Sequence, residues 1–168
     1  MNDDRLLTCL ALLGSALFAW LVLGGRVPVA PASATPPADE RVATVAEAIA
    51  KAEGYYARGD HDGRSLLFRL NNPGGLKNPA LGAETLPTWK DTGLVLFPTA
   101  EMGWAALRHQ VRLMLTGRSR VYELTDTLLL VGVKYADGDV NWGWNVAGHL
   151  GVSPDVSLGD LAPLVPAP

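Results

Sequence analysis

The stretch FPTAEMGWAALRHQVRLMLTG, residues 97–117, carries the strongest helical pattern in the chain. Thr99 is a residue type that favours a helix N-cap, and Glu101 places a negative charge in the first turn, next to the positive end of the helix dipole. Apolar side chains then recur every three or four residues as one stripe: Trp104, Leu107, Val111 and Met114. Gly117 is typical of the residue that ends a helix. The stretch therefore predicts an amphipathic helix whose apolar stripe faces a core.

An earlier helix is expected before Gly54. Thr44 and Glu47 have the spacing of a capping box, with Thr44 as the N-cap. The helix would run through Ala48 to Glu53, and Gly54 would stop it. Residues 55–64 are polar and glycine-rich, which predicts a loop.

Further helices are expected after residue 117. The pattern favours one helix over residues 126–135, a second over 142–150 with Asn141 as its cap and Gly151 as its stop, and a last short turn within 157–164. Residues 94–97 are β-leaning and predict one arm of a small hairpin that follows the dense turn signal of residues 71–75. The expected fold class is α+β, predominantly helical, with one small β-hairpin.

The N-terminal part has a different character. An uncharged apolar run begins at Leu6 and ends at Gly25 (residues 6–25), about the length that crosses a bilayer as a helix. It is interpreted as a signal anchor in residues 1–26, followed by a proline- and alanine-rich linker in 27–40 and a domain in 41–168. The alternative is a signal peptide cleaved near Ala34.

The charged residues that flank this segment give little indication of which side of the membrane its N-terminus lies on. Arg5 is offset by Asp3 and Asp4, and Arg26 follows the run. The expected arrangement is a single-pass inner-membrane protein with its domain in the periplasm. If the segment is cleaved, the domain would be secreted.

Charge and cysteine content narrow the function classes. The net charge is −3 and no basic block is present, which argues against nucleic-acid binding. The only cysteine, Cys9, lies in the apolar run, so the domain has no disulfide and no thiol nucleophile. Three scattered histidines, His61, His109 and His149, lack a metal-binding spacing. No metal or cofactor is therefore expected.

Glu53 is the first candidate for chemistry. It lies in the last turn of the expected first helix, where the negative end of the dipole disfavours another negative charge. Tyr55 and Tyr56 follow it, and aromatic neighbours would desolvate the carboxyl. Both effects raise a carboxyl pKa, which a general acid for glycoside cleavage requires. The simpler interpretation is a solvated glutamate at a helix end.

A second carboxylate often accompanies such an acid. Asp60 and Asp62 lie in the following loop, although loop aspartates beside glycine are commonly turn formers. A lytic transglycosylase needs no second acid, because the acetamido group of its substrate assists.

Polar and aromatic side chains are candidates for sugar contacts. Asn71 and Asn72 either form the turn before Pro73 or donate hydrogen bonds to a glycan. The aromatic candidates for stacking on sugar rings are Trp89, Trp142, Trp144, Tyr55, Tyr56 and Tyr135. Because Trp142 and Trp144 flank a glycine, at least one of them should face solvent.

Five segments occur in an order that is similar to a known family: AIAKAEGYY (48–56), LNNPGGLK (70–77), VLFPTAEMGWAALRHQV (95–111), KYADGD (134–139) and NVAGHLGVSPDVSL (145–158). Together they resemble a family of lysozyme-like proteins of phages and proteobacteria, often described as virion-associated lysis proteins. The resemblance spans about residues 45–158. Its most specific parts are the NNPG turn and the FPTAE-GWAAL segment.

The resemblance implies a lysozyme-like fold with Glu53 as acid/base. It also places glycan contacts on Asn71, Asn72 and Tyr135. Departures from the family pattern are Gly75 in place of asparagine, Met102 in place of aspartate, and a different loop at residues 138–142.

Phage lysozymes with a glutamate, aspartate and threonine site offer a second comparison. Asp62 fits the place of the aspartate, but Phe68 stands where the threonine would be. This favours a transglycosylase-like mechanism over that of these phage lysozymes.

The sequence therefore predicts a membrane-tethered glycosidase, either a muramidase or a lytic transglycosylase, that acts on peptidoglycan strands. Glu53 is the expected general acid, and the expected substrate contacts are Asn71, Asn72, Tyr135, Tyr55 and Trp142. The alternative is a non-catalytic protein on the same fold that binds glycan or helps assemble a virion or cell-envelope complex.

Overall fold

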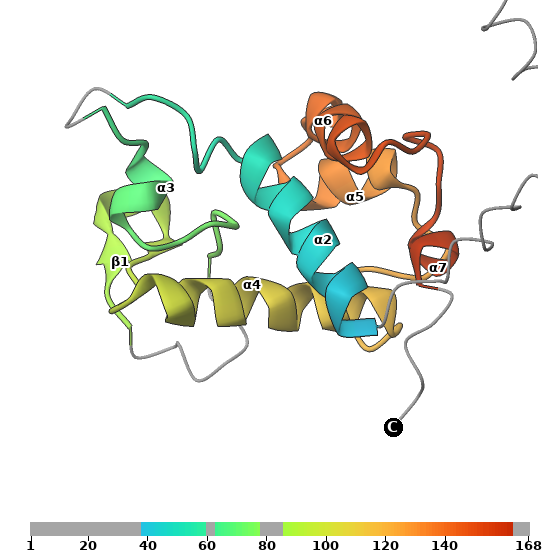
Figure 1. Cartoon of the computed structure of the whole chain (residues 1–168), viewed down its shortest axis with the longest axis horizontal. Helices are drawn as coiled ribbons and strands as arrows, with labels where there is room; N and C mark the ends of the chain where they lie inside the picture. Colours follow the sequence, from blue (N-terminus) through green and yellow to red (C-terminus); the bar gives the residue numbers. More distant parts are fainter. Residues whose placement is uncertain (1–37, 60–62, 78–85, 163–168) are drawn as a thin grey trace, which may run out of the picture. The chain divides into compact units, whose positions relative to one another are not determined.

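The computed structural model describes residues 38–59, 63–77 and 86–162. They form a predominantly helical domain with one two-stranded antiparallel sheet (Figure 1). The expected helical class and the small hairpin are thus confirmed. The apolar run of residues 6–25 and most of the linker lie outside the described residues. Within the described part, no helix combines the length and the apolar character needed to cross a membrane.

The elements follow one another as α2 (Ala38–Ala52), α3 (Leu66–Arg69), β1 (Thr88–Trp89), the short 3-10 helix η2 (Lys90–Thr92), β2 (Leu94–Val95), α4 (Ala100–Leu115), α5 (Leu128–Tyr135), α6 (Val140–Leu150) and α7 (Leu158–Leu161). In Figure 1, α2 crosses α4, and α5 and α6 lie together beside α2. The core is built mainly from α2, α4, α5 and α6.

The helix predicted from residues 97–117 is present as α4. The hydroxyl oxygen of Thr99 accepts a hydrogen bond from the Met102 amide at 3.3 Å, as an N-cap should. Three members of the predicted stripe, Leu107, Val111 and Met114, are buried. Trp104 is only partly buried and packs at the edge of the core.

The predicted start of the first helix was wrong. Helix α2 begins at Ala38, so Thr44 lies inside it and its hydroxyl donates to the Glu40 carbonyl at 2.9 Å. A threonine that bonds back to the carbonyl four residues earlier fits a helix interior, and the sequence spacing alone cannot distinguish this from a cap. The predicted stop is confirmed, because α2 ends at Ala52 and Gly54 has a φ of 73°.

The later helices occur where they were predicted, with shifted caps. Helix α5 begins after Thr127, two residues later than expected. The N-cap of α6 is Asp139, not Asn141, because the Asp139 carboxylate accepts from the Asn141 amide at 2.9 Å. Gly151 ends α6 in a left-handed conformation, and Ser157 caps the short α7.

Two smaller elements complete the domain. The sheet pairs Thr88 with Val95 and Trp89 with Leu94, so the predicted arm of residues 94–97 forms a strand only at its first two positions. Helix α3 was not predicted. It spans four residues, none of them buried, and such a short element leaves no periodic apolar signal.

Close backbone contacts fix how α5 and α6 pack. A Cβ on Gly143 would lie 2.5 Å from the Leu128 carbonyl oxygen, and a Cβ on Gly132 would lie 2.9 Å from the Gly143 nitrogen. The two helices approach this closely because both contact positions are glycine. This packing holds the start of α6 beside the end of α5, where the candidate site is found.

Candidate functional site

Glu53 follows the last residue of α2, and its amide continues the helical pattern by donating to the Ile49 carbonyl at 2.8 Å. Its side chain is half-buried. One carboxylate oxygen, Oε1, accepts a hydrogen bond of 2.6 Å from the indole Nε1 of Trp142 on α6. The helix end and α6 together therefore hold this carboxyl in one orientation.

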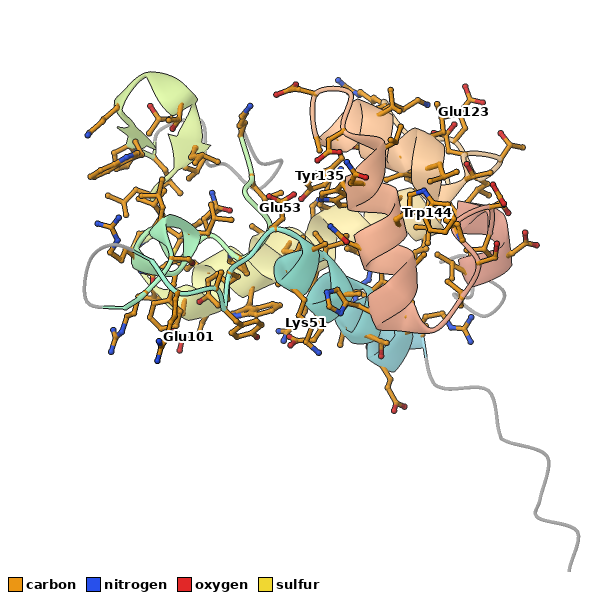
Figure 2. The ribbon with its side chains drawn as sticks, turned by 90° about the horizontal axis from the view of Figure 1, so that it is seen from above. Lys51, Glu53, Glu101, Glu123, Tyr135 and Trp144 are labelled. Carbon is orange, nitrogen blue, oxygen red and sulfur yellow. The ribbon has the colours of Figure 1, made fainter. Side chains whose placement is uncertain are left out.

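Two stacked aromatic rings support this contact. The rings of Trp142 and Tyr135 lie 4.6 Å apart between centroids, with an interplanar angle of 23°. The Tyr135 hydroxyl donates to the Gly74 carbonyl at 2.6 Å. Tyr135 thus links the end of α5 to the turn of residues 71–77, and Figure 2 shows it next to Glu53.

The second carboxylate oxygen, Oε2, faces the glycine turn. A Cβ built on Gly75 would lie 2.7 Å from Oε2, closer than a real Cβ approaches. Gly75 also has a φ of 58°, a left-handed conformation that glycine and asparagine adopt more readily than other residues. Because Oε1 already accepts from Trp142, Oε2 is the oxygen left to carry an acidic proton.

Burial raises the pKa of the Glu53 carboxyl above its ordinary value, while the hydrogen bond from Trp142 and the charge of Lys77 lower it. The net direction is the one predicted from the sequence. The predicted cause, in which neighbouring aromatic residues desolvate the carboxyl, was only partly right. Burial does raise the pKa, but the aromatic side chain that hydrogen-bonds the carboxyl is Trp142, and its N–H favours the ionised form.

The pKa of Tyr135 is raised well above its ordinary value, first by burial and then by the charge of Glu53 and by Tyr122. The Tyr135 hydroxyl therefore stays protonated at physiological pH. The neutral hydroxyl donates a hydrogen bond to the Gly74 carbonyl.

A hollow of about 260 Å³ adjoins this cluster. Gly75, Lys77, Gln110, Tyr122 and Tyr135 contribute to its lining. It shares Gly75 and Tyr135 with the surroundings of Glu53, although Glu53 itself does not line it. Lys77 also forms an exposed ion pair of 3.2 Å with Asp137 in the α5–α6 loop. The hollow offers aromatic walls, one amide and one cation beside the carboxyl.

The two asparagines of the turn have internal partners. Asn72 is fully buried: its Nδ2 donates to the carbonyls of Leu76 and Val95, and its Oδ1 accepts from the Leu76 amide. Asn71 is half-buried with a φ of 54°, and its Nδ2 donates to the Phe97 carbonyl at 3.0 Å. Asn72 therefore has no surface left for the predicted glycan contact, and the turn-forming interpretation fits it.

The predicted aromatic contacts separate into buried and exposed residues. Tyr55 and Trp142 are each only 4% exposed, so neither offers a ring face to a sugar. Tyr55 instead packs in the core against Phe68 and Trp104. Trp144 is 58% exposed, which confirms that at least one tryptophan of this pair faces solvent. The candidate carboxylates Asp60 and Asp62 lie outside the described residues.

Sequence reasoning missed three features of the site. Trp142 was proposed as a sugar contact and is instead the partner of Glu53, from which 89 positions separate it. Lys77 and Asp137 were not considered, since isolated charged residues carry no signal. Gly75 was noted only as a departure from the pattern that the sequence resembles, and its φ of 58° is a left-handed conformation that glycine adopts readily. Among the described residues, no three side chains of the metal-ligating types gather as a metal site.

Comparison with known proteins gives no match: no family model fits the chain, and neither a curated protein nor a solved structure is significantly similar to it. The functional argument therefore depends on the geometry around Glu53.

Proposed function

We propose that this domain is a lysozyme-like glycosidase that cleaves peptidoglycan strands, with Glu53 as the general acid. The observation that carries the proposal is the state of one carboxyl group. It is half-buried, its pKa is raised, and one of its oxygens is held by Trp142. A general acid must remain protonated near neutral pH and must be oriented toward the leaving oxygen.

The bond-breaking step assigns different roles to the two carboxyl oxygens. Oε1 stays bonded to Trp142 Nε1, and the proton on Oε2 passes to the glycosidic oxygen as the bond from that oxygen to the anomeric carbon breaks. The acetamido oxygen of the sugar attacks the anomeric carbon and forms a cyclic oxazolinium ion. This route needs no second protein carboxylate.

The second step regenerates the acid. The Glu53 carboxylate accepts a proton from the nucleophile that opens the oxazolinium ring. If the nucleophile is water, the enzyme is a hydrolase with a reducing-end product. If it is the C6 hydroxyl of the same sugar, the enzyme is a lytic transglycosylase and the product is a 1,6-anhydro sugar. Phe68 stands where phage lysozymes with a glutamate, aspartate and threonine site have the threonine, and this difference favours the lytic transglycosylase.

The test is peptidoglycan digestion by the full-length protein in detergent, with products identified by mass spectrometry. Glu53→Gln keeps the size of the side chain and an acceptor for Trp142 but removes the acidic proton. We expect it to lose at least about a hundredfold in rate, the scale of general acid catalysis. The matched control is Glu123→Gln, which changes an exposed glutamate that Figure 2 shows well away from Glu53. Equal rates for Glu53→Gln and wild type would overturn the proposal.

The same assay separates the two reaction types. An anhydro product is one water lighter than the hydrolysis product. The proposal includes a tether at residues 6–25 that holds the domain on the periplasmic face of the inner membrane. Cleavage near Ala34 would instead release it, which fractionation of tagged protein would reveal.

A non-catalytic role is the second candidate, and the exposure of Trp144 favours it. A tryptophan that is 58% exposed on α6 is suited to contact glycan or a partner in a virion or envelope complex. In that case Trp144→Ala would weaken peptidoglycan pull-down, whereas Glu53→Gln would leave both pull-down and biological function unchanged.

A further inference from the structure

A second, larger hollow of about 560 Å³ lies over the exposed face of α2. Its floor includes Glu40, Glu47 and Lys51 of α2, one wall includes Trp104 and Arg108 of α4, and His149 contributes from the end of α6. We call this the α2 groove. Lys51 and Glu53 are two positions apart, roughly 200° around a helix, so the groove and the candidate acid lie on different sides of the end of α2. Figure 2 shows the two side chains separated in this way.

The direction of the groove follows from contacts at its two ends. Trp104 meets Tyr55, just beyond the end of α2, with ring centroids 5.8 Å apart. Further along α4, Arg112 forms an ion pair with Asp39 at the start of α2. Helix α4 therefore crosses α2 obliquely (Figure 1), with its first half near the end of α2 and its last turns near the start of α2. The floor of the groove, from residue 40 to residue 51, is about 16 Å long at the helical rise. A peptide of four residues in extended conformation is about 14 Å long, so its length matches the floor.

The charges in the groove are of both signs. The Glu47 carboxylate accepts from the Tyr56 hydroxyl at 3.1 Å and lies 3.7 Å from the Lys51 ammonium. Among the described residues, Arg108 and Glu40 form no ion pair. The Arg108 guanidinium instead lies 5.6 Å from the centre of the Trp104 ring. The groove thus presents one cation and one carboxylate that have no charged partner within the described part of the domain.

We propose that the α2 groove binds a short peptide that carries both free carboxylates and a free amine, the chemistry of the peptides attached to bacterial wall glycan. This choice of ligand rests on the proposed function, since a glycan-cleaving domain meets such peptides on its own substrate. Arg108 binds a peptide carboxylate, and Glu40 with Glu47 binds the amine. A neutral sugar fits less well, because Arg108 covers a face of the Trp104 ring.

The test measures binding of a synthetic wall-type tetrapeptide to the full-length Glu53→Gln protein in detergent, by calorimetry. Two modified peptides serve as probes, one with its carboxylates amidated and one with its amine acetylated. With an intact groove, each modification should weaken binding by about threefold to fivefold, the range of a single exposed charge contact. Arg108→Gln should remove the preference for free carboxylates, and Glu40→Gln should remove the preference for a free amine.

The matched control is Arg118→Gln, which removes the same charge at an exposed position beyond the end of α4 and should leave both preferences intact. Absence of binding, or preferences that survive Arg108→Gln and Glu40→Gln, would overturn the proposal. The groove does not use Glu53, so the two proposals fail separately. Peptide binding without glycan cleavage would exclude the enzyme alone, and cleavage without peptide binding would exclude the groove alone.

Discussion

The indole nitrogen of Trp142 donates a 2.6 Å hydrogen bond to Oε1 of Glu53, and the two residues are 89 positions apart in the chain. The bond joins the end of α2 to α6. It satisfies one oxygen of a carboxyl that burial would otherwise isolate, and it leaves the other oxygen beside Gly75. It also opposes the effect of burial on the pKa of Glu53. Trp142 therefore sets both the orientation and the acidity of the candidate acid.

Trp142→Phe tests this role while keeping an aromatic ring against Tyr135. Loss of the N–H removes a contribution that lowers the pKa of Glu53, so that pKa should rise further. A general acid stops working as pH rises through its pKa, so the alkaline limb of the activity profile should move to higher pH. The maximal rate should fall about tenfold or more as the carboxyl loses its orientation. A pH–rate profile of both proteins measures the two effects.

The exposed Trp144 on the same helix provides the matched control. Trp144→Phe should leave the alkaline limb in place. If Trp142→Phe lowered the rate without moving that limb, Trp142 would be a packing residue with no influence on the acid.

The raised pKa of Glu53 also predicts how stability depends on pH. The folded state binds the Glu53 proton more tightly than the unfolded state does, because burial raises the folded pKa. Between the unfolded and folded pKa values the native state holds more protons, so this group lowers stability as pH rises through that window. Glu53→Gln should therefore melt at a higher temperature than wild type at pH 7, and the difference should shrink at pH 4.

Thermal melts of the two proteins at a series of pH values measure this difference. A difference in melting temperature that stays constant across the series would show that burial does not destabilise the Glu53 carboxylate. A Glu53→Gln protein that melts below wild type at pH 7 would show the same.

Local patterns predicted much of the fold. The stripe and cap of α4 and the glycine stops at Gly54 and Gly151 depend on neighbours within a few residues, so they can be read from short segments. The caps of α2 and α6 were misplaced because several residues near each start can bond the backbone. Only tertiary packing decides which of them does.

The candidate site could be predicted only in part. Glu53 was found because its position at a helix end and its glycine neighbour are local features. The role of Trp142 could not be found, because its contact with Glu53 depends on how α5 and α6 pack through Gly132 and Gly143. For the same reason Asn72 was interpreted as a possible surface contact, although the strand at Val95 buries it.

Asn72 is expected to be a stability residue. Its amide makes three hydrogen bonds, to the Leu76 amide and carbonyl and to the Val95 carbonyl. Asn72→Ala should cost about 2–4 kcal/mol, since it removes three buried hydrogen bonds and leaves the Leu76 amide without its acceptor, while the Leu76 carbonyl still accepts from the Val95 amide. Asn72→Asp should cost more, because a carboxylate oxygen would face two carbonyl oxygens. Chemical denaturation measures both, and the exposed Asn145→Ala should stay within about 0.5 kcal/mol of wild type.

Gly103 brings helix α4 into contact with the turn of residues 71–75. A Cβ on Gly103 would lie 1.7 Å from the Asn71 carbonyl oxygen and 3.0 Å from Pro73, so α4 packs directly on the backbone of the NNPG turn. Asn71 reinforces the contact, because its Nδ2 donates to the Phe97 carbonyl just before α4. The NNPG and FPTAE-GWAAL segments therefore form one packed unit that supports the turn beside Glu53.

Gly103→Ala should destabilise the domain by about 3 kcal/mol or more, since the clash is with backbone that cannot move without displacing the turn. Gly148→Ala is the matched substitution in another helix, where nothing lies within 4 Å of the added Cβ. It should stabilise the domain by about 0.5–1 kcal/mol, because alanine restricts the unfolded chain and favours the helix. Opposite signs for the same chemical change would show that contact with the turn, and not helix propensity, requires glycine at position 103. Two substitutions with the same sign in denaturant melts would contradict this packing of α4 on the NNPG turn.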